Sequence, residues 1–210
     1  RQSEMADKLK IDRAACKRML DDLEFVGMVE RRIPMGNSPK KPVYSIKDPF
    51  ISFSFNVISN NIRMIGRSSS KAEAYSLLKN DIDIQVGHMF EKLCGDWLDS
   101  KYAVVERGQW WGRIDDTDVD IDVVAKVSDE HRLIRTVLGE CKFSSKPMGF
   151  NAYNTLVSRA KKAGFTENTI FVLFSALGFE AELSEYAEEN GIILIDGQIW
   201  IGDEKTPEIF

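Results

Sequence analysis

The 210-residue chain has few cysteines and no long apolar segment. Its three cysteines are odd in number and lack metal-ligand spacing, which argues against a disulfide framework and a structural zinc site; we expect Cys16, Cys94 and Cys141 to be mostly buried thiols. Apolar runs such as residues 192–195 are far shorter than the roughly 20 residues that a membrane span requires. No signal peptide opens the sequence, so we predict a cytoplasmic protein.

Two further absences limit the chemistry. No Gly-x-x-x-x-Gly-Lys-Ser/Thr phosphate loop occurs, so any nucleotide hydrolysis must reside outside these residues. The two histidines, His88 and His131, do not suggest a catalytic dyad, and we interpret both as surface or core residues. The first residue is Arg rather than Met, and we expect the chain to be a piece of a longer protein.

The net charge of -5 is distributed unevenly along the chain. Residues 1–47 carry 11 Lys and Arg against 7 Asp and Glu, a balance of +4, which leaves -9 for the remainder. A basic front and an acidic back suggest two modules, the first suited to facing a polyanion and the second to binding cations. The alternative reading is that +4 is ordinary surface variation in a short segment.

Residues 1–47 have the pattern of a winged helix-turn-helix. Helix-forming residues 3–10 precede Asp12, an N-cap for a second helix that runs to Val26 and stops at Gly27. A strand over 28–33, a hairpin tip over 34–42 rich in Pro, Gly and Lys, and a return strand over 43–46 follow. Residues 20–32, Leu-Asp-Asp-Leu-Glu-Phe-Val-Gly-Met-Val-Glu-Arg-Arg, resemble the recognition helix and first wing strand of prokaryotic winged helix-turn-helix domains.

In such domains the second helix can lie in the major groove while the wing contacts backbone phosphates. The basic candidates for DNA binding on the helix and the wing are Arg13, Lys17, Arg18, Lys40 and Lys41. Acidic side chains on the same helix, Asp21, Asp22 and Glu24, would oppose close approach of phosphates over part of its surface. A winged helix that joins domains or partners without touching DNA is the alternative.

Residues 48–70 are predicted to be a linker helix. Asp48 is its N-cap, and Pro49 occupies the first helical position, where its missing N–H costs nothing. The apolar residues between 50 and 58 predict that this helix is buried between modules, and the three serines at 68–70 mark a break. We therefore predict a winged helix over 1–47, a linker helix over 48–70 and an α/β domain over 71–210.

The back module begins with a helical pattern over 71–101, expected in two pieces. In the second piece, Val86, Phe90, Leu93 and Trp97 define a core face, with Glu91 beside it. A carboxylate in that position can join a metal site; the alternative is a solvated glutamate. Strands over 102–111, 119–127 and 132–143 follow, and then helices over 150–162 and 180–189 alternate with strands over 169–174 and 192–195. This order predicts an α/β domain with a mixed sheet.

Two of these strands carry the candidate site. Alternation places Glu140 and Lys142 on one face of their strand, and the intervening turn makes Asp122 and Glu140 cross-strand neighbours. The same alternation assigns Val119, Ile121 and Val123 to one face and Asp118, Asp120 and Asp122 to the other. Asp122 is the preferred metal ligand because it lies deepest in the apolar stretch, where an ionised group most needs a partner, and Asp120 is its assistant.

Two carboxylates that can hold a divalent cation, next to a lysine that can reach a phosphate or water, are what metal-assisted phosphodiester hydrolysis requires. Lys146, in the loop after the strand of Glu140, is a candidate for contacting the substrate backbone.

Three segments in order, Gly87-x-x-Phe90-Glu91, Asp120-Ile121-Asp122-Val123-Val124-Ala125 and Gly139-Glu140-Cys141-Lys142, resemble the PD-(D/E)xK restriction-endonuclease-like superfamily over about residues 82–195. Ile121-Asp122 stands where the motif name has Pro-Asp. The resemblance implies a restriction-endonuclease-like mixed-sheet α/β domain in which Asp122 and Glu140 ligate Mg²⁺ or Mn²⁺ with help from Glu91. Lys142 would then orient the attacking water and stabilise charge on the phosphate.

Nearly the whole chain also resembles the C-terminal region of prokaryotic AAA-type ATPases of the STAND group, in Val-Tyr-Ser-Ile-Lys-Asp-Pro-Phe, Trp-Trp-Gly-Arg, Asp-Ile-Asp-Val-Val-Ala and Gly-Glu-Cys-Lys-Phe. In that group a nucleotide-binding module precedes a winged helix and a nuclease-like domain of unknown function. Two functions stay open. One is a metal-dependent DNA endonuclease-like domain with a DNA-binding winged helix; the other is a non-catalytic DNA- or protein-interaction module that regulates such an ATPase.

Overall fold

The computed structural model describes residues 1–36, 42–165, 168–197 and 207–208. The chain divides into two compact units, the first formed by Arg1–Ile33 with Lys40–Met89 and the second by Pro34–Pro39 with Phe90–Phe210. The boundaries predicted from the sequence, after residues 47 and 70, stay predictions.

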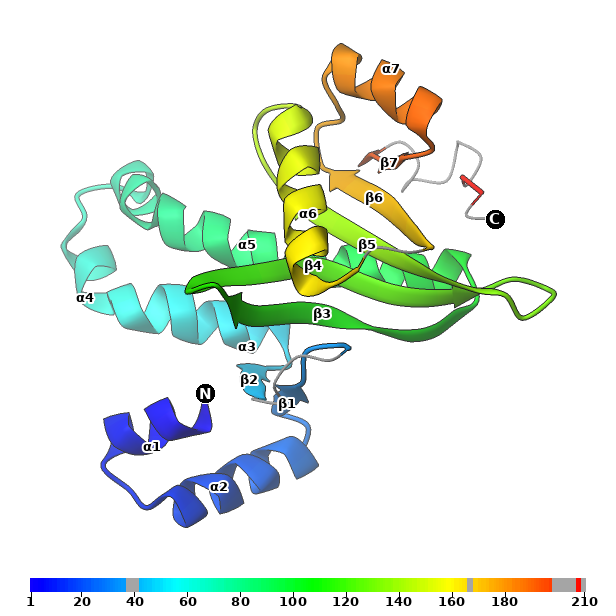
Figure 1. Ribbon diagram of the computed structural model, residues 1–210. Coiled ribbons are helices and arrows are strands. Elements are labelled where there is room, and N and C mark those ends of the chain that lie inside the picture. The colour runs from blue at the N-terminus through cyan, green and yellow to red at the C-terminus, as the bar shows by residue number, and fades with distance from the viewer. Residues whose placement is uncertain (37–41, 166–167, 198–206, 209–210) are drawn as a thin grey trace. The chain divides into compact units, whose positions relative to one another are not determined.

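The first unit begins with two helices and a two-stranded sheet (Figure 1). Helix α1 (Gln2–Leu9) is followed by α2 (Arg13–Phe25), and β1 (Val29–Arg32) pairs antiparallel with β2 (Val43–Ile46). The Asp12 carboxylate accepts hydrogen bonds from the backbone N–H groups of Ala14 at 2.9 Å and Ala15 at 3.2 Å, which confirms it as the N-cap of α2. The expected order of helix, helix and hairpin is present; its role as a DNA-binding winged helix stays a prediction.

The rest of the first unit is helical. Helix α3 (Pro49–Phe53) continues through the π-helix η1 (Ser54–Ser59) into α4 (Asn60–Arg67), and α5 (Lys71–Lys101) starts after the predicted serine break. Asp48 caps α3 by accepting the Ile51 N–H at 2.9 Å, as predicted. Buried Gln85 of α5 donates to Ser52 Oγ at 2.9 Å, so a polar contact ties α3 to the first half of α5. Phe50 is 76% exposed, where the sequence predicted burial.

The second unit contains a five-stranded mixed sheet. Its strands, in spatial order, are β3 (Val104–Ile114), β4 (Thr117–Ser128), β5 (Ile134–Lys142), β6 (Thr169–Ser175) and β7 (Ile193–Ile195). The first three pair antiparallel, and β5, β6 and β7 pair parallel. Asp115 and Asp116 have φ angles of 47° and 60°, which suits the two-residue turn between β3 and β4. The predicted α/β class with a mixed sheet is confirmed.

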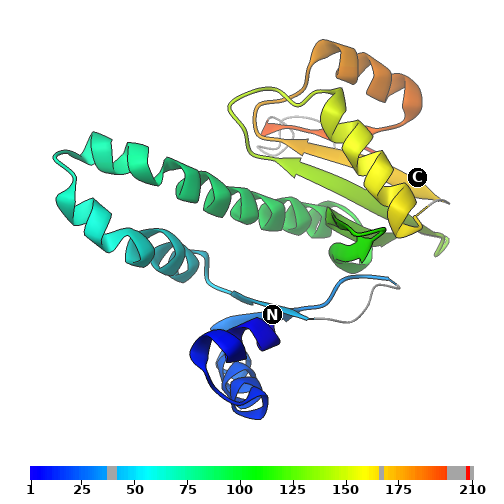
Figure 2. The same ribbon diagram turned by 60° about the vertical axis from the view of Figure 1, so that its left-hand side comes forward.

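Helices cover both faces of this sheet. The C-terminal half of α5 packs on one face, and α6 (Phe150–Ala163) and α7 (Ala181–Asn190) pack on the other (Figure 2). On the central strand β6, Val172 and Phe174 face the α5 side and Leu173 faces the α6 side, so the strand is covered on both faces as predicted. The layers therefore enclose two apolar clusters, one on each side of the sheet.

Helix α5 departs from the sequence prediction in two respects. It is one continuous helix from Lys71 to Lys101, whereas two pieces were expected. The expected core residue Leu93 is 50% exposed, and its neighbour Cys94 is fully buried instead. The other two cysteines, Cys16 and Cys141, are also buried, as expected.

In the part of the chain that the structure describes, no helix combines the length and the apolar character needed to cross a membrane.

Candidate functional site

A β-bulge in β4 shapes the candidate site. The pairing of β3 with β4 joins Gly108 to Val124 and Trp110 to Ile121, so the single residue Gln109 lies opposite two residues, Asp122 and Val123. An extra residue in one strand breaks the alternation of faces and increases the local twist. Ile121 accordingly lies in the cluster on the α6 side, whereas Val123 lies in the cluster on the α5 side. The prediction that Val119, Ile121 and Val123 share one face was therefore wrong.

Beyond the bulge, the ladder between β4 and β5 ends. Its last pair is Val123 with Gly139, so Asp122 and Glu140 are the next residues on the two strands. The backbone N–H of Cys141 donates to Oδ2 of Asp122 at 2.8 Å. The Asp122 side chain thus holds the two strands together where the main-chain pairing stops, and it is fixed beside Glu140.

Glu140 is a buried carboxylate held by two cations. Its side chain is only 2% exposed. Lys142 Nζ lies 2.6 Å from its Oε1, as expected for two residues on the same face of a strand, and Arg159 Nη1 lies 3.3 Å from its Oε2. Burial lowers the pKa of Lys142, but the hydrogen bond and the charge of Glu140 outweigh it, so the pKa lies above its usual 10.5. Lys142 therefore stays protonated at neutral pH.

Arg159 belongs to the site, although it was not predicted from the sequence. It lies on α6, and its Nη2 also approaches Oδ1 of Asp120 at 3.3 Å. The guanidinium thereby links Asp120 to Glu140. A sequence signal did exist: Leu156 and Ala160, which flank Arg159 on α6, are the buried residues of that helix, so Arg159 borders the face that packs on the sheet.

The pKa of Asp122 is raised from 3.8 to about 7. Burial is the largest cause, followed by the charge of Glu140 and then that of Glu91, while the hydrogen bond from Cys141 opposes them. Glu91, on α5, accepts a hydrogen bond at 2.9 Å from Nε2 of Gln109, the residue opposite the bulge. Glu91 on α5, Asp122 on β4 and Glu140 on β5 are therefore close enough for the charges of the two glutamates to raise the pKa of Asp122.

The donor chemistry of these carboxylates suits a divalent cation. Within the described ranges, no group of three or more His, Cys, Asp or Glu is arranged to hold a metal ion. Mg²⁺, however, is commonly bound by one or two carboxylates with retained waters. The site has four carboxylates and two cations, namely Glu91, Asp120, Asp122 and Glu140 with Lys142 and Arg159. A dication would balance that charge and offset the repulsion that Glu140 and Glu91 exert on Asp122, so Asp122 and Glu140 fit a metal of the magnesium type.

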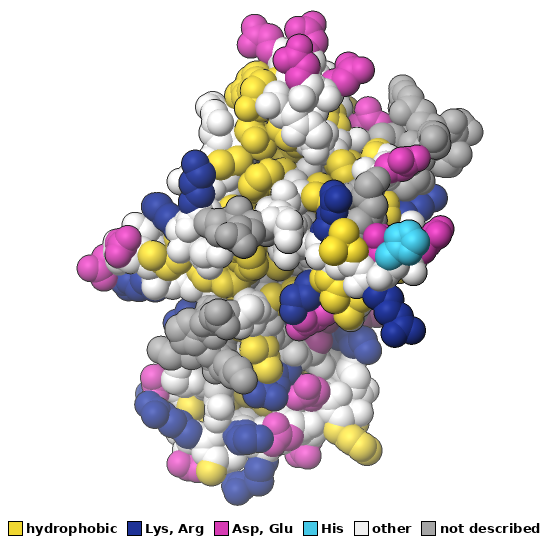
Figure 3. Space-filling view, turned by 45° about the vertical axis from the view of Figure 1, so that its right-hand side comes forward, with side chains coloured by type: hydrophobic (Ala, Val, Ile, Leu, Met, Phe, Trp, Pro, Cys, Tyr) yellow, Lys and Arg dark blue, Asp and Glu magenta, His cyan; other side chains and the backbone are white. Residues whose placement is uncertain are grey.

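The basic residues predicted to bind DNA do not form one continuous basic surface on α2. Arg13, Lys17 and Arg18 are exposed on α2, and Lys17 Nζ pairs with Asp21 at 2.6 Å. In the lower part of Figure 3, which shows one face of α1 and α2, basic and acidic side chains are interspersed. Lys40 and Lys41 lie outside the described residues.

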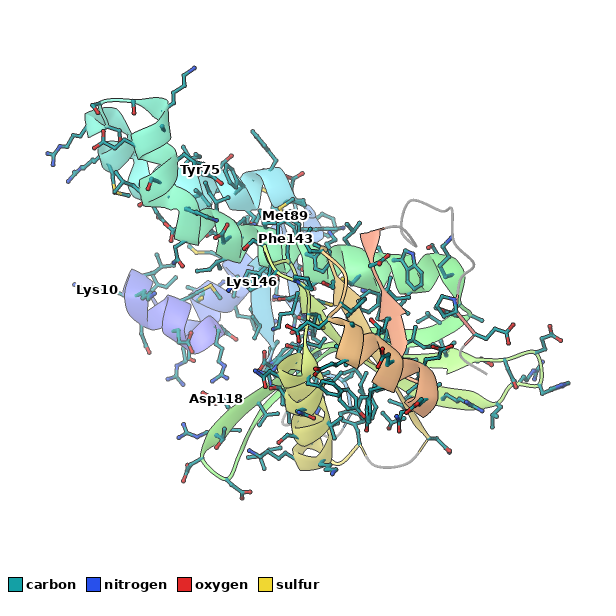
Figure 4. All side chains as sticks on the ribbon, turned by 90° about the horizontal axis from the view of Figure 1, so that it is seen from above. Lys10, Tyr75, Met89, Asp118, Phe143 and Lys146 are labelled. Atoms are coloured by element: carbon teal, nitrogen blue, oxygen red, sulfur yellow. The ribbon has the colours of Figure 1, made fainter. Side chains whose placement is uncertain are left out.

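Lys146 is exposed in the loop between β5 and α6, which also carries the exposed Phe143 (Figure 4). This loop directly follows Lys142, so its side chains begin close to the acidic site. The contact of Lys146 with the substrate backbone stays a prediction.

A sequence model of the DUF234 family, archaeal and bacterial proteins of unknown function, matches residues 54–159, which is half of the chain. The chain belongs to this family. The matched segment contains the whole site, from Glu91 to Arg159.

Solved structures resemble the chain only weakly. A protein of unknown function, AF1548, is 25% identical with a TM-score of 0.38 and coverage of 57% of this chain and 59% of that one. The MspJI restriction endonuclease in complex with a 27-mer oligonucleotide is 18% identical with a TM-score of 0.38, covering 62% and 30% of the two chains. Protein VC1899 from Vibrio cholerae is 13% identical with a TM-score of 0.34, covering 86% and 38%.

The chain thus spans less than two thirds of the length of each of these three structures. No curated protein matches the chain.

Proposed function

We propose that the second unit hydrolyses phosphodiester bonds with a divalent cation, Mg²⁺ or Mn²⁺, held by Asp122 and Glu140. The observation that supports this function is the meeting of a buried carboxylate, Glu140, a partly buried one, Asp122, and the ammonium group of Lys142 where β4 and β5 separate. A buried carboxylate pair is electrostatically costly unless a cation shares it. Lys142 and Arg159 supply two positive charges against the four carboxylates of the site, Glu91, Asp120, Asp122 and Glu140, which leaves an excess of two negative charges.

Each side chain has a role that follows from its position. A bound dication would supply charge stabilisation at the phosphate and a more acidic water molecule. Asp122 and Glu140 would hold it from adjacent strands, and Glu91 would contribute directly or through a water molecule from α5. Lys142, which stays protonated and has half of its side chain exposed, would donate a hydrogen bond to the attacking water or to a phosphate oxygen.

DNA is the proposed substrate. Residues 1–47 carry a balance of +4, and Arg13, Lys17 and Arg18 are exposed on α2. Lys146 extends from the loop that follows Lys142. The acidic balance of the remaining chain would repel a polyanion, so these local basic groups would have to attract it.

Incubation of the protein with supercoiled plasmid in Mg²⁺, Mn²⁺ or EDTA tests this proposal. Lys126 provides a matched control for Lys142, because each lysine pairs with a glutamate, at 2.9 Å and 2.6 Å, and their side chains are 49% and 48% exposed. We expect wild type and Lys126→Ala to nick the plasmid only with a metal, and Lys142→Ala to be inactive. Equal metal-dependent cutting by Lys142→Ala and Asp122→Asn would remove the site assignment.

One observation favours a second function. Both oxygens of Glu140 already contact cations, so the protein compensates this buried charge without a metal. A non-catalytic module would need no metal at this position. Such a module would bind DNA or a protein partner, such as the ATPase module to which the sequence resemblance points. Plasmid binding by mobility shift without cutting in either metal would support this second function over the first.

A further inference from the structure

Arg159 occupies one side of the proposed metal ligand Glu140. Its Nη1 and Nη2 lie 3.3 Å from Glu140 Oε2 and 3.3 Å from Asp120 Oδ1, respectively. The guanidinium group presents several N–H donors in a planar fork, so one arginine can hold two carboxylates at once. Any cation that uses Oε2 of Glu140 has to compete with this group.

The helix fixes the backbone of Arg159, whereas its side chain is partly exposed. Leu156 and Ala160 are 0% and 1% exposed and pack in the cluster under α6, which anchors the backbone on either side of Arg159. The Arg159 side chain is 29% exposed, and that of Asp120 is 60% exposed. The guanidinium can therefore release buried Glu140 while it remains at the more exposed Asp120.

The two cations on Glu140 are not held equally. Lys142 Nζ lies 2.6 Å from Oε1, whereas both contacts of Arg159 are 3.3 Å long. Strong charge-assisted hydrogen bonds between nitrogen and a carboxylate are about 2.7 to 2.9 Å long. The longer contacts of Arg159 make it the cation that a metal would displace first.

We infer that Arg159 is a positioning residue that neutralises Glu140 before metal binding and sets the affinity of the site for a divalent cation by competing for Oε2. This inference rests on the proposed function, because it takes Asp122 and Glu140 as the ligands. It adds a regulatory property. The site binds a metal ion only when the Arg159 guanidinium has left Glu140 and is held by Asp120 alone.

Calorimetric titration of the full chain with Mn²⁺ tests the inference without any activity measurement. The protein is first stripped with EDTA and then titrated at pH 8, where Asp122 is mostly ionised. Arg159→Gln removes the charge, Arg159→Lys keeps it, and Arg113→Gln removes an exposed arginine that pairs with Asp116 at 3.4 Å in the β3–β4 hairpin.

Arg159→Gln is expected to bind Mn²⁺ roughly tenfold more tightly than wild type, since one partly screened unit charge has been removed close to the bound ion. Arg159→Lys should stay within about threefold of wild type because a competing cation remains. Arg113→Gln should be unchanged. Circular dichroism on the same samples shows whether each variant is folded, and Arg159→Met, which removes the same charge, takes the place of Arg159→Gln in every comparison if Arg159→Gln is not folded.

The outcomes separate the two proposals. Unchanged or weaker Mn²⁺ binding by Arg159→Gln, or tighter binding by Arg159→Lys than by Arg159→Gln, overturns the inference about Arg159. If Asp122→Asn still abolishes the wild-type binding in that case, the proposed metal site stands. If neither wild type nor Arg159→Gln binds Mn²⁺, both the metal site and the inference are overturned.

Discussion

Asp122→Asn is expected to stabilise the metal-free protein above neutral pH, although it removes a proposed metal ligand. Asp122 is ionised at pH 8 against the opposition of burial and of the charges of Glu140 and Glu91. Asparagine has no charge to bury, and it keeps a side-chain oxygen that can accept the hydrogen bond from the Cys141 N–H. The substitution therefore removes the electrostatic cost and retains the contact between the strands.

The size and the pH dependence of this effect follow from the Asp122 pKa. A pKa of about 7 in place of 3.8 corresponds to roughly 4 kcal/mol of destabilisation when the group is fully ionised. Partial exposure to water reduces this to about 2 to 3 kcal/mol. Because the folded pKa is raised, the unfolded chain loses the proton first. The wild type therefore loses stability as the pH rises from about 4 to about 7, and the loss is constant above that.

Urea unfolding in EDTA at pH 5 and pH 8 measures this effect. The free energy of unfolding of Asp122→Asn should exceed that of wild type by about 2 to 3 kcal/mol at pH 8 and by less than half of that at pH 5. Asp118→Asn, an exposed position on the same strand, should change it by no more than about 0.5 kcal/mol at either pH. Destabilisation by Asp122→Asn at pH 8, or an equal effect at both pH values, would refute the reasoning.

Three further substitutions test features of the fold by urea unfolding. Gly139→Ala should lower the free energy of unfolding by about 1 to 3 kcal/mol, because its Cβ would lie 3.0 Å from the Cβ of buried Val123; an unchanged value would contradict the close approach of β4 and β5. Asp12→Ala should cost about 1 kcal/mol through loss of the α2 cap, and a neutral result would show that the cap contributes nothing. Leu138→Ala, at a fully buried position, should cost about 2 to 5 kcal/mol, clearly more than Leu133→Ala at a 52% exposed position.

Local sequence signals predicted much of the fold. Asp12 and Asp48 cap helices because a short acidic side chain before a helical pattern satisfies the first free N–H groups. The alternation around Glu140 and Lys142 placed both side chains on one face, since β5 is regular at that point. These features depend on residues within a few positions of each other.

Features that arise from pairing between distant segments could not be predicted in the same way. The bulge at Asp122 exists because Gln109, on another strand, faces two residues of β4, and nothing in the alternation of β4 itself reports it. Arg159 reaches Glu140 from a helix 19 residues further along the chain. A helical period shows which residues face the core, but it does not show which strand residue a bordering arginine contacts.

The central claim is that Asp122 and Glu140 share one divalent cation. Anomalous diffraction from crystals soaked in Mn²⁺ tests it most directly. We predict one manganese peak within about 2.0 to 2.6 Å of a carboxylate oxygen of each residue, with Arg159 moved away from Glu140. A map without a peak between these two carboxylates, in which Lys142 and Arg159 still hold both oxygens of Glu140, would contradict the account.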